Sequence, residues 1–413
     1  MEKNNKNYES ELPPVLLLNG GVVALSVARS LGKKGIKVYA LDIPENYGRY
    51  SKYSNRIQYN GGKSIEDWVY WLTGKALEKL RGSVIFPVSD PIIEMVSRYR
   101  KQLSDHYILP EINDNLMLSL LDKAETYKIA EKIGVPAPKV WCVNSEEDIL
   151  GIMSSLSFPC ALKPRFSHEF KGHNFLKKIF IVNNQQELLS EFKFLNELGQ
   201  KNNFRADLIV TELIPGIGEN QFQSYYSYFD ENGIPLMSFT KRKLRQYPIY
   251  SGYGTYQTVG DWNPKVAELG LKFMQGANYF GLGNVEFKLD PRDGILKLME
   301  CNTRLTTATE LIVSSGFNIS LFIYNRLVGK ELPPYDNYRK ETTLIRPVRD
   351  FLSFWNARKE NNSTWRSYLK SISKKHSYEV FSWKDLMPWI MLGLHFIKRA
   401  KVLMLFNSKK NTG

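Results

Sequence analysis

The chain has 413 residues, 43% of them hydrophobic and 24% charged, which is the composition of a globular protein with two or three domains. Its net charge of +14 is concentrated near the C-terminus, because residues 335–413 contain 16 Lys and Arg against 6 Asp and Glu and the rest of the chain carries only +4. Residues 1–334 are nearly balanced in charge and contain no basic motif with interspersed aromatic residues, which argues against a general nucleic-acid-binding protein.

Three scattered cysteines, Cys142, Cys160 and Cys301, have neither metal-ligand spacing nor the even number of a disulfide framework. The N-terminal stretch MEKNNKNYESELPP is polar and has no apolar signal-peptide region. These features predict a cytoplasmic protein.

The first part of the chain alternates apolar strands with helices. Strands are predicted at 14–20, 36–42, 83–90 and 106–110, with the helical patterns VALSVARSLGKKG and PIIEMVSRYRKQL between them. Apolar strands separated by helices predict a parallel sheet covered on both faces. The first turn, NGGVVALS, lacks a full G-x-G-x-x-G, so the glycines indicate a tight turn rather than a dinucleotide site.

From LLDKAETYKIAEKIGVPAPKVW onward the pattern mixes helices and strands. The helix SEEDILGIMSSL precedes the strands FPCALKP and KKIFIV, and the helix NQQELLSEFKFLNEL precedes the strand DLIVTELIPG. The stretch QFQSYYSYFDENGIPLMSFTKRKLRQYP predicts a hairpin that turns at 230–233. A second hairpin is predicted for NVEFKLD and ILKLMECNTRL, which flank the turn PRDG.

Two glutamates in this second hairpin are expected to face each other. If the strands pair regularly about the turn, Glu286 lies opposite Glu300, and strand alternation places Asn302 and Arg304 on the side of Glu300. Like charges opposite each other destabilise a sheet. A Mg²⁺ or Mn²⁺ ion held by Glu286, Glu300 and Asn302 would remove the conflict, and Arg304 would meet an anion. The alternative is a solvated polar hairpin with loose register.

In this order the motifs resemble those of the ATP-grasp ligases, whose nucleotide domain ends with a glutamate on one strand and an E-x-N-x-R-type element on the next. The resemblance covers residues 14–330 and implies an α/β chain in three parts. An N-terminal parallel βα domain (1–113) precedes a two-lobed ATP-grasp domain of α+β type (114–332), and a basic, partly apolar helical region (333–413) follows.

On the nucleotide side, the resemblance implies two phosphate-binding lysines, an adenine-binding hinge and a ribose-binding acid. The lysines lie in LLDKAETYK and in the strand FPCALKPRF, the hinge is VTELIPG, and the acid follows the hinge. The implied ATP-binding residues are Lys123, Lys163, Glu212, Leu213, Ile214 and Glu219.

The resemblance implies an enzyme that joins a carboxylate, amino-acid or peptide-like, to an amine. ATP would convert the carboxylate into an acyl phosphate, and ADP and phosphate would be released. Arg304 would stabilise the acyl phosphate and the oxyanion formed from it. In SFTKRKLRQYP, the side chains of Lys241, Lys243 and Arg245 share one strand face, and Arg245 or Lys241 is the predicted catalytic cation. A basic exposed strand is the alternative.

One loop departs from the family pattern. The segment RFSHEFKGHNFLKK after the lysine strand contains only Gly172 where the family has a glycine-rich loop, so His168, Lys171 and His173 would replace backbone amides or lie in solvent. This departure leaves open a catalytically silent ATP-grasp scaffold that binds a partner. A NAD(P)-binding oxidoreductase built on the first βα units is a weaker alternative, because it leaves the acidic hairpin unexplained.

The segment DLMPWIMLGLHFIKRAKVLMLF (385–406) is apolar nearly all round but is interrupted by Lys398, Arg399 and Lys401. Its uninterrupted run is too short to span a bilayer comfortably. A helix lying in the membrane interface and a helix packed on the body remain equal alternatives. The expected partners are a small-molecule acid and amine and no nucleic acid, with association at the inner face of the membrane left open.

Overall fold

The computed structural model describes residues 12–62, 64–166, 179–202, 207–219, 221–250, 252–335, 338–360, 362–395 and 397. The chain folds into two compact units. The first consists of Met1–Pro110, Phe317–Pro334 and Tyr378–Gly413, and the second of Glu111–Gly316 and Tyr335–Ser377. The region that the sequence analysis treated as a separate third part is therefore divided between the two units.

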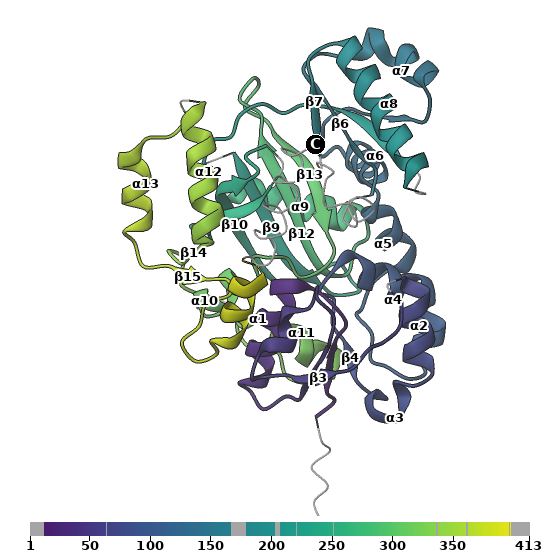
Figure 1. The fold of residues 1–413 in the computed structure, drawn as a ribbon, viewed down its shortest axis with the longest axis vertical. Helices are drawn as coiled ribbons and strands as arrows, with labels where there is room; N and C mark the ends of the chain where they lie inside the picture. Colours follow the sequence, from purple (N-terminus) through teal and green to yellow (C-terminus); the bar gives the residue numbers. More distant parts are fainter. Residues whose placement is uncertain are drawn as a thin grey trace, which may run out of the picture. The chain divides into compact units, whose positions relative to one another are not determined.

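The first unit contains the predicted parallel sheet. Its strand order is β3 (Asn55–Ile57), β2 (Val38–Leu41), β1 (Val15–Leu17) and β4 (Val84–Ile85), and all three pairings are parallel. The predicted fourth strand at 106–110 is wrong, since this stretch forms only an isolated bridge from Ile108 to Val84. The labelled helices of this unit are α1 (Gly21–Gly32), α2 (Ile65–Thr73), α3 (Leu77–Leu80), α4 (Asp90–Leu103) and α11 (Ile319–Leu327) (Figure 1), and residues 387–395 are also helical.

The turn between β1 and α1 depends on a glycine. Gly20 has a φ of 110° and precedes α1. A Cβ at this position would lie 2.7 Å from the Cβ of Val88, so both the backbone conformation and the packing favour glycine. The predicted tight turn is confirmed.

A buried ion pair joins the end of the chain to the first unit. Arg29 on α1 donates from Nε to Oδ2 of Asp385 at 2.9 Å, and its Nη2 donates to the carbonyl oxygens of Val380 and Asp385. Ser51 Oγ donates to the same carboxylate at 2.7 Å. These contacts explain why residues after Tyr378 belong to this unit rather than to a separate tail.

The smaller lobe of the second unit is a four-stranded antiparallel sheet. Its order is β5 (Val140–Val143), β8 (Leu208–Glu212), β6 (Cys160–Pro164) and β7 (Phe180–Val182). The helices α7 (Glu146–Ile152) and α8 (Gln185–Lys201) pack on it, and their apolar side chains share one core with the strands. This sheet carries the predicted lysine strand, β6, and the predicted hinge at the end of β8.

The larger lobe is a seven-stranded sheet that contains both predicted hairpins, and its first six strands in the order below pair antiparallel. Its order is β13 (Leu296–Asn302), β12 (Gly281–Leu289), β9 (Phe222–Phe229), β10 (Pro235–Tyr247), β11 (Tyr253–Thr258), β14 (Thr343–Ile345) and β15 (Ser377–Tyr378). The helices of the second unit outside the smaller lobe are α5 (Asp114–Leu121), α6 (Lys123–Ile133), α9 (Pro264–Gly276), α10 (Thr309–Ser315), α12 (Pro347–Lys359) and α13 (Trp365–Ile372). Within the described ranges, no helix is long and apolar enough to cross a membrane.

Candidate functional site

The acidic pair predicted from the second hairpin is present. In the antiparallel pairing of β12 with β13, Glu286 is the direct partner of Glu300, and Asn284 is the partner of Asn302. The side chain of Asn302 donates from Nδ2 to Glu300 Oε1 at 2.9 Å. Because alternate side chains share a face, the two carboxylates and the two amides form one polar row. The predicted pairing of Glu286 with Glu300 is confirmed, but the strands do not pair regularly about the turn, because the register shifts between Glu286 and Phe287.

Arg304 does not lie on the strand. β13 ends at Asn302, so the predicted alternation stops before Arg304, which lies in a bend just after the strand. Its Nη1 donates to the carbonyl oxygen of Leu305 at 3.2 Å. The partly buried guanidinium therefore lies just beyond the acidic row, held from a loop rather than from a strand.

Two lysines of β10 offset the charge of Glu286. Across the sheet, Glu286 pairs with Ser224 on β9, and Ser224 pairs with Lys241 on β10, so the three side chains share one face. Lys241 Nζ donates to Ser224 Oγ at 3.1 Å and lies 3.9 Å from Glu286 Oε1, and Lys243 contacts the other carboxylate oxygen directly. Burial by itself would raise the pKa of Glu286, but the ammonium groups of Lys243 and Lys241 lower it to about 2.

These two lysines differ in their own proton affinities. Burial lowers the pKa of Lys241 to about 8, against the opposing attraction of Glu286. Burial also acts to lower the pKa of Lys243, but its closer contact with Glu286 and the charge of Glu300 raise it above the ordinary value. Lys241 therefore loses its proton at a lower pH than Lys243.

The lysine strand of the smaller lobe converges on the same carboxylates. Lys163 on β6 is buried, and its Nζ lies 3.4 Å from the hydroxyl of Tyr127 on α6. That hydroxyl donates to the carbonyl oxygen of Met299 at 2.8 Å, immediately before Glu300. Burial and the neighbouring charge of Lys123 lower the pKa of Lys163 to about 7, although Glu300 acts in the opposite direction.

The second predicted phosphate-side lysine, Lys123, is the first residue of α6. Its Nζ donates to the carbonyl oxygen of Pro164 at 2.9 Å, so it lies at the end of the lysine strand beside Lys163. Asp122 caps the same helix by accepting from the Ala124 amide at 2.9 Å, and it forms an ion pair with Arg165. The structure thus brings the two predicted lysines together.

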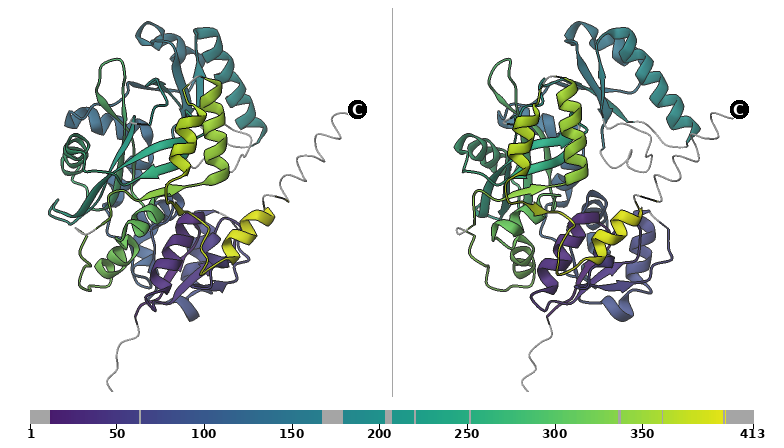
Figure 2. Two further views of the ribbon diagram at one scale, coloured as in Figure 1. Left: turned by 90° about the vertical axis from the view of Figure 1, so that its left-hand side faces the viewer. Right: turned by 60° about the vertical axis from the view of Figure 1, so that its left-hand side comes forward.

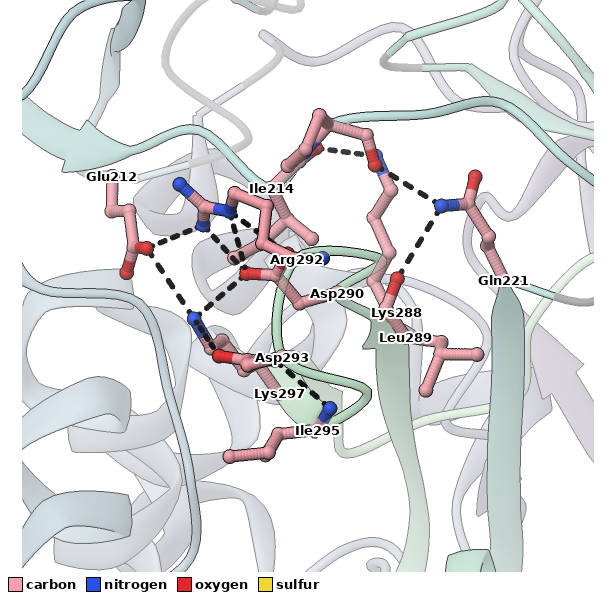
Figure 3. A network of polar contacts seen from close by, with 11 residues as sticks. Glu212, Ile214, Gln221, Lys288, Leu289, Asp290, Arg292, Asp293, Ile295 and Lys297 are labelled. Atoms are coloured by element: carbon pink, nitrogen blue, oxygen red, sulfur yellow. Dashed lines mark hydrogen bonds and ion pairs between the residues drawn. The ribbon is translucent and has the colours of Figure 1, made fainter.

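At the predicted hinge, the side chain of Glu212 belongs to an ion-pair network (Figure 3). Its Oε1 accepts from Arg292 Nη2 at 2.5 Å and from Lys297 Nζ at 3.3 Å. Asp290 accepts from the same two cations, which ties the β12–β13 turn to the end of β8. The carboxylate of Glu212 is thereby engaged by two cations.

The backbone after Glu212 also has a partner. Lys288 on β12 is buried, and its Nζ donates to the carbonyl oxygen of Ile214 at 2.6 Å, close to Gln221 (Figure 3). Burial lowers the pKa of Lys288 to about 8. Leu213 lies between Glu212 and Ile214 in the segment that Lys288 holds against the larger sheet.

Arg245 has contacts that fit a structural role. Its guanidinium forms a two-point ion pair with Asp350 on α12, with Nε–Oδ1 and Nη2–Oδ2 distances of 2.9 and 2.8 Å. It also donates to Ser371 Oγ at 2.9 Å and lies over the ring of Tyr256. The exposed Glu219 is 3.7 Å from Arg245 Nη1. Of the two cations predicted for catalysis, only Lys241 faces the carboxylates.

Several residues singled out in the sequence lie outside the described ranges. Of the residues singled out there, His168, Lys171, Gly172 and His173 lie outside the described residues, as do Lys398, Arg399 and Lys401 of the C-terminal segment. Their proposed contacts stay predictions.

The oxygen donors of the acidic row fit a hard divalent cation. Glu286, Glu300 and Asn302 present carboxylate and amide oxygens from adjacent strands, which are the ligands that Mg²⁺ prefers. Asn284 adds a buried Oδ1 that has no hydrogen-bond partner in the described structure. An unsatisfied buried oxygen is costly, and a nearby cation or its water would remove that cost. Only two of these ligands are carboxylates, and the described residues contain no group of three or more His, Cys, Asp and Glu side chains that could hold a metal ion.

Three polar residues of the site were not assigned roles from the sequence. Lys243, Lys288 and Asn284 each lie two residues from a residue that the sequence analysis considered on the same strand face. Strand alternation is therefore the sequence signal that could have found these three residues. Strand alternation does not give the order of the strands in the sheet, which places Lys243 rather than Arg245 against Glu286.

Comparison with curated proteins gives distant relatives. D-aspartate ligase from Enterococcus faecium (strain Aus0004) is 28% identical over 252 residues, which cover 60% of this chain and 59% of that protein. The C-terminal section of the carbamoyl phosphate synthase large chain from Methanopyrus kandleri is 21% identical over 220 residues, covering 52% of this chain and 38% of that protein. The chain thus spans less than two thirds of the length of these relatives. No protein-family profile matches the chain.

Solved structures share the fold over most of the chain. The biotin carboxylase domain of the Hydrogenobacter thermophilus 2-oxoglutarate carboxylase, in complex with MgADP and bicarbonate, gives a TM-score of 0.64 at 19% identity and covers 81% of this chain and 73% of that chain. The ADP complex of purK, an N5-carboxyaminoimidazole ribonucleotide synthetase, gives a TM-score of 0.60 at 14% identity, covering 79% and 80%. The architecture expected from the sequence motifs is the one that these structures have.

Proposed function

We propose that this chain, which has the ATP-grasp fold, is an ATP-dependent ligase that joins a carboxylate to an amine and releases ADP and phosphate. A carboxylate oxygen of the acid attacks the γ-phosphorus of ATP, and the bond from that phosphorus to the leaving ADP oxygen breaks. The amine nitrogen then attacks the carbonyl carbon of the acyl phosphate. The C–O bond to phosphate breaks, and the amine loses a proton.

The observation that carries this proposal is the charge of the buried site. Lys163, Lys241 and Lys243 surround the carboxylates of Glu286 and Glu300, and Lys123 and Lys288 lie close by. Burial holds the pKa values of Lys163 and Lys241 far below that of a free lysine. Buried cations in this number favour a polyanion, and a polyphosphate accompanied by a divalent cation satisfies both the lysines and the glutamates.

Glu286, Glu300 and Asn302 would hold Mg²⁺ or Mn²⁺, with Asn284 beside them. When bound, the ion supplies charge neutralisation to the phosphate oxygens. Phosphoryl transfer needs positioning and neutralisation more than covalent help. This requirement agrees with a site made of lysines, carboxylates and amides.

The lysines divide between the two lobes. Lys163 on β6 of the smaller lobe and Lys123 at the start of the neighbouring α6 bind the phosphates of the nucleotide, while Lys241 and Lys243 on β10 face the phosphoryl group that is transferred. Arg304 stabilises the acyl phosphate and the oxyanion derived from it, a contribution commonly worth about 3–4 kcal/mol for one donor.

The base lies against the hinge, where the backbone at Leu213 and Ile214 reads its edge and Lys288 holds the segment in place. Glu212 supports the hinge through Arg292 and Lys297 rather than contacting the base with its carboxylate. Glu219, exposed after the hinge, binds the ribose.

One of the two substrates is an amino acid or a peptide-like molecule. The D-aspartate ligase relative supports this class by its name, and it makes D-amino acids the first compounds to examine. Acid and amine substrates are small molecules, and the balanced charge of residues 1–334 agrees with the absence of a nucleic-acid partner.

We also propose that the C-terminal segment attaches the protein to the inner face of the membrane. Beyond the anchor at Asp385, the apolar side chains of Trp389, Ile390, Leu394 and Ile397 are exposed. The sequence from 398 to 413 then contains five Lys and Arg and no acid. Exposed apolar residues beside cations are typical of a helix that lies at an anionic membrane surface.

Thermal unfolding with and without ATP–Mg²⁺, followed by an ADP-release screen of acids with amines, tests the ligase proposal. A Mg²⁺-dependent stabilisation by ATP and ADP release that requires both an acid and an amine are expected. Stabilisation by ATP without ADP release for any pair would favour a silent scaffold. Stabilisation by NADH instead of ATP would favour an oxidoreductase.

A further inference from the structure

The helix α12 has an unusual orientation relative to the sheet it covers. Its buried positions are Asp350, Ser353 and Phe354, and the side chains of Asp350 and Ser353 make polar contacts with β10 and β11. Its large apolar side chains at Val348, Phe351 and Leu352 face solvent. A helix that covers a sheet normally does the reverse, so the outward apolar face needs another explanation.

The exposed apolar residues of α12 form a continuous stripe. Val348, Phe351, Leu352 and Trp355 have the spacing i, i+3, i+4 and i+7, which places them on one helix face. Within the described structure these side chains are between 38% and 63% exposed. Isolated exposed apolar residues are ordinary, but a full stripe marks an interaction site.

The helix α13 repeats the pattern. Trp365, Leu369 and Ile372 are all exposed and have the spacing i, i+4 and i+7. Tyr368, between them, is buried and stacks on Phe354 of α12 with ring centroids 4.2 Å apart. Figures 1 and 2 show α12 and α13 side by side. We call the exposed side chains of the two helices the α12–α13 patch: Val348, Phe351, Leu352, Trp355, Trp365, Leu369 and Ile372.

The patch is attached rigidly to the larger sheet. Asp350 receives two hydrogen bonds from Arg245 on β10 and one from Thr255 on β11 at 3.0 Å. Ser353 Oγ donates to the carbonyl oxygen of Gln246 at 2.7 Å. The apolar stripe is therefore presented by a fixed element, which favours a built docking surface over a mobile helix that only lacks a neighbour.

The charges around the patch indicate its partner. The two helices and the residues just after them present one exposed acid, Glu360, and many exposed cations: Arg349, Arg358, Lys359, Arg366, Lys370, Lys374 and Lys375. A two-fold contact between copies of the chain would bring these cations against each other. An anionic surface with an apolar layer beneath it satisfies both the cations and the aromatic side chains.

We propose that the α12–α13 patch docks on an anionic lipid bilayer. Trp355, Trp365 and Phe351 enter the interface between headgroups and acyl chains, and the flanking Arg and Lys side chains contact the lipid phosphates. This surface belongs to the described residues of the second unit and is separate from the C-terminal segment. The chain would then contact the membrane through two elements, each with its own apolar residues.

The test is sedimentation of the full chain with vesicles of phosphatidylglycerol and phosphatidylcholine in about equal parts, against vesicles of phosphatidylcholine alone. We expect binding only to the anionic vesicles. Val348→Ser/Trp355→Ser/Leu369→Ser should weaken it by more than about tenfold, because the apolar contacts with the bilayer are lost. The matched control, Tyr70→Ser/Phe194→Ser/Ile234→Ser, removes apolar side chains that are as exposed and should bind like the wild type.

Two further variants keep the test decisive. Arg366→Glu/Lys370→Glu reverses two exposed charges without changing the aromatic packing and should also reduce vesicle binding. Trp389→Ser/Ile390→Ser changes exposed side chains of the C-terminal segment only, so vesicle binding through the α12–α13 patch should remain. Wild-type binding by the α12–α13 triple variant, or no binding by the wild type, would overturn the proposal. It would also be overturned by a wild-type dimer in light scattering that the triple variant converts to a monomer.

Discussion

Glu286 on β12 and Glu300 on β13 are direct partners in an antiparallel strand pair, and the lysines of β10 lie on the side of Glu286 away from Glu300. Two carboxylates in this arrangement repel each other. The contacts of Lys243 and Lys241 with Glu286 offset part of the repulsion, but Glu300 receives only the amide of Asn302 among the hydrogen bonds described for its carboxylate.

The first prediction concerns Glu300→Gln. The substitution removes the second carboxylate, so the folded protein should be no less stable without ligand, while its stabilisation by ATP–Mg²⁺ should largely disappear. For a ligand at a hundred times its dissociation constant, the stabilisation at stake is about 2.7 kcal/mol. Thermal unfolding with ATP, with Mg²⁺ and with both measures it.

Glu197→Gln on α8 is the matched control, since Glu197 is exposed and lies outside the site. It should show the wild-type response to ATP–Mg²⁺. A Glu300→Gln variant with an unchanged response would show that the acidic pair does not hold the metal.

The second prediction concerns pH and Lys163, whose pKa in the folded protein is about 7 against 10.5 for an ordinary lysine. Between these values the unfolded chain binds more protons than the folded protein, so the free energy of unfolding should rise as the pH rises. In Lys163→Met this rise should be smaller. It should not vanish, because Lys241 and Lys288 have lowered pKa values as well.

Bound ATP should keep these buried lysines protonated to a higher pH. Phosphates favour the charged lysines, so ATP affinity should increase as the pH is lowered from about 9 to about 7 and the lysines become protonated. Urea unfolding across this range and ATP titrations at its two ends provide the measurements. An identical pH slope in wild type and Lys163→Met would contradict the assignment of a buried, easily deprotonated lysine.

The third prediction separates Arg245 from Lys243. Arg245→Met leaves Asp350 buried without its ion-pair partner, which should cost about 3–5 kcal/mol of unfolding free energy. Arg245→Met/Asp350→Asn removes both charges and should recover much of that loss. Lys243→Met should instead reduce ADP release far more than it reduces stability, because Lys243 contacts Glu286 in the site.

Urea unfolding and ADP release are measured on the same preparations of each variant. If Arg245→Met kept full stability but lost ADP release, the catalytic role first predicted for Arg245 would hold and the structural role would be wrong.

The limits of sequence reasoning are visible in the contrast between Glu300 and Arg245. Strand alternation and a recognisable turn predict Glu286 close to Glu300, because both signals are local, but the register shift between Glu286 and Phe287 that makes them direct partners has no signal in the sequence pattern. The partner of Arg245 is Asp350, 105 residues away on a helix whose packing no local pattern discloses. Alternation predicts side-chain direction only within a strand. Because β13 ends at Asn302, Arg304 lies in the following bend and not on the strand as predicted.

The C-terminal region also has a long-range contact that its local sequence does not predict. Composition separates residues 333–413 as basic and partly apolar. It does not show that Asp385 pairs with Arg29, 356 residues earlier. This ion pair and the hydrogen bonds from Arg29 and Ser51 hold the segment to the first unit, and composition carries no information about such contacts.

The fourth prediction tests that ion pair. Asp385→Leu leaves the buried guanidinium of Arg29 without its carboxylate and removes the acceptor for Ser51, so the first unit should lose about 3–5 kcal/mol of stability. Limited proteolysis should cut the variant after Tyr378 faster than the wild type, because the anchor of the segment is gone. Lys384→Leu, one residue earlier and exposed, is the control and should be cut at the wild-type rate. Equal cleavage of both variants would mean that the segment is held by its apolar contacts and not by the Arg29–Asp385 pair.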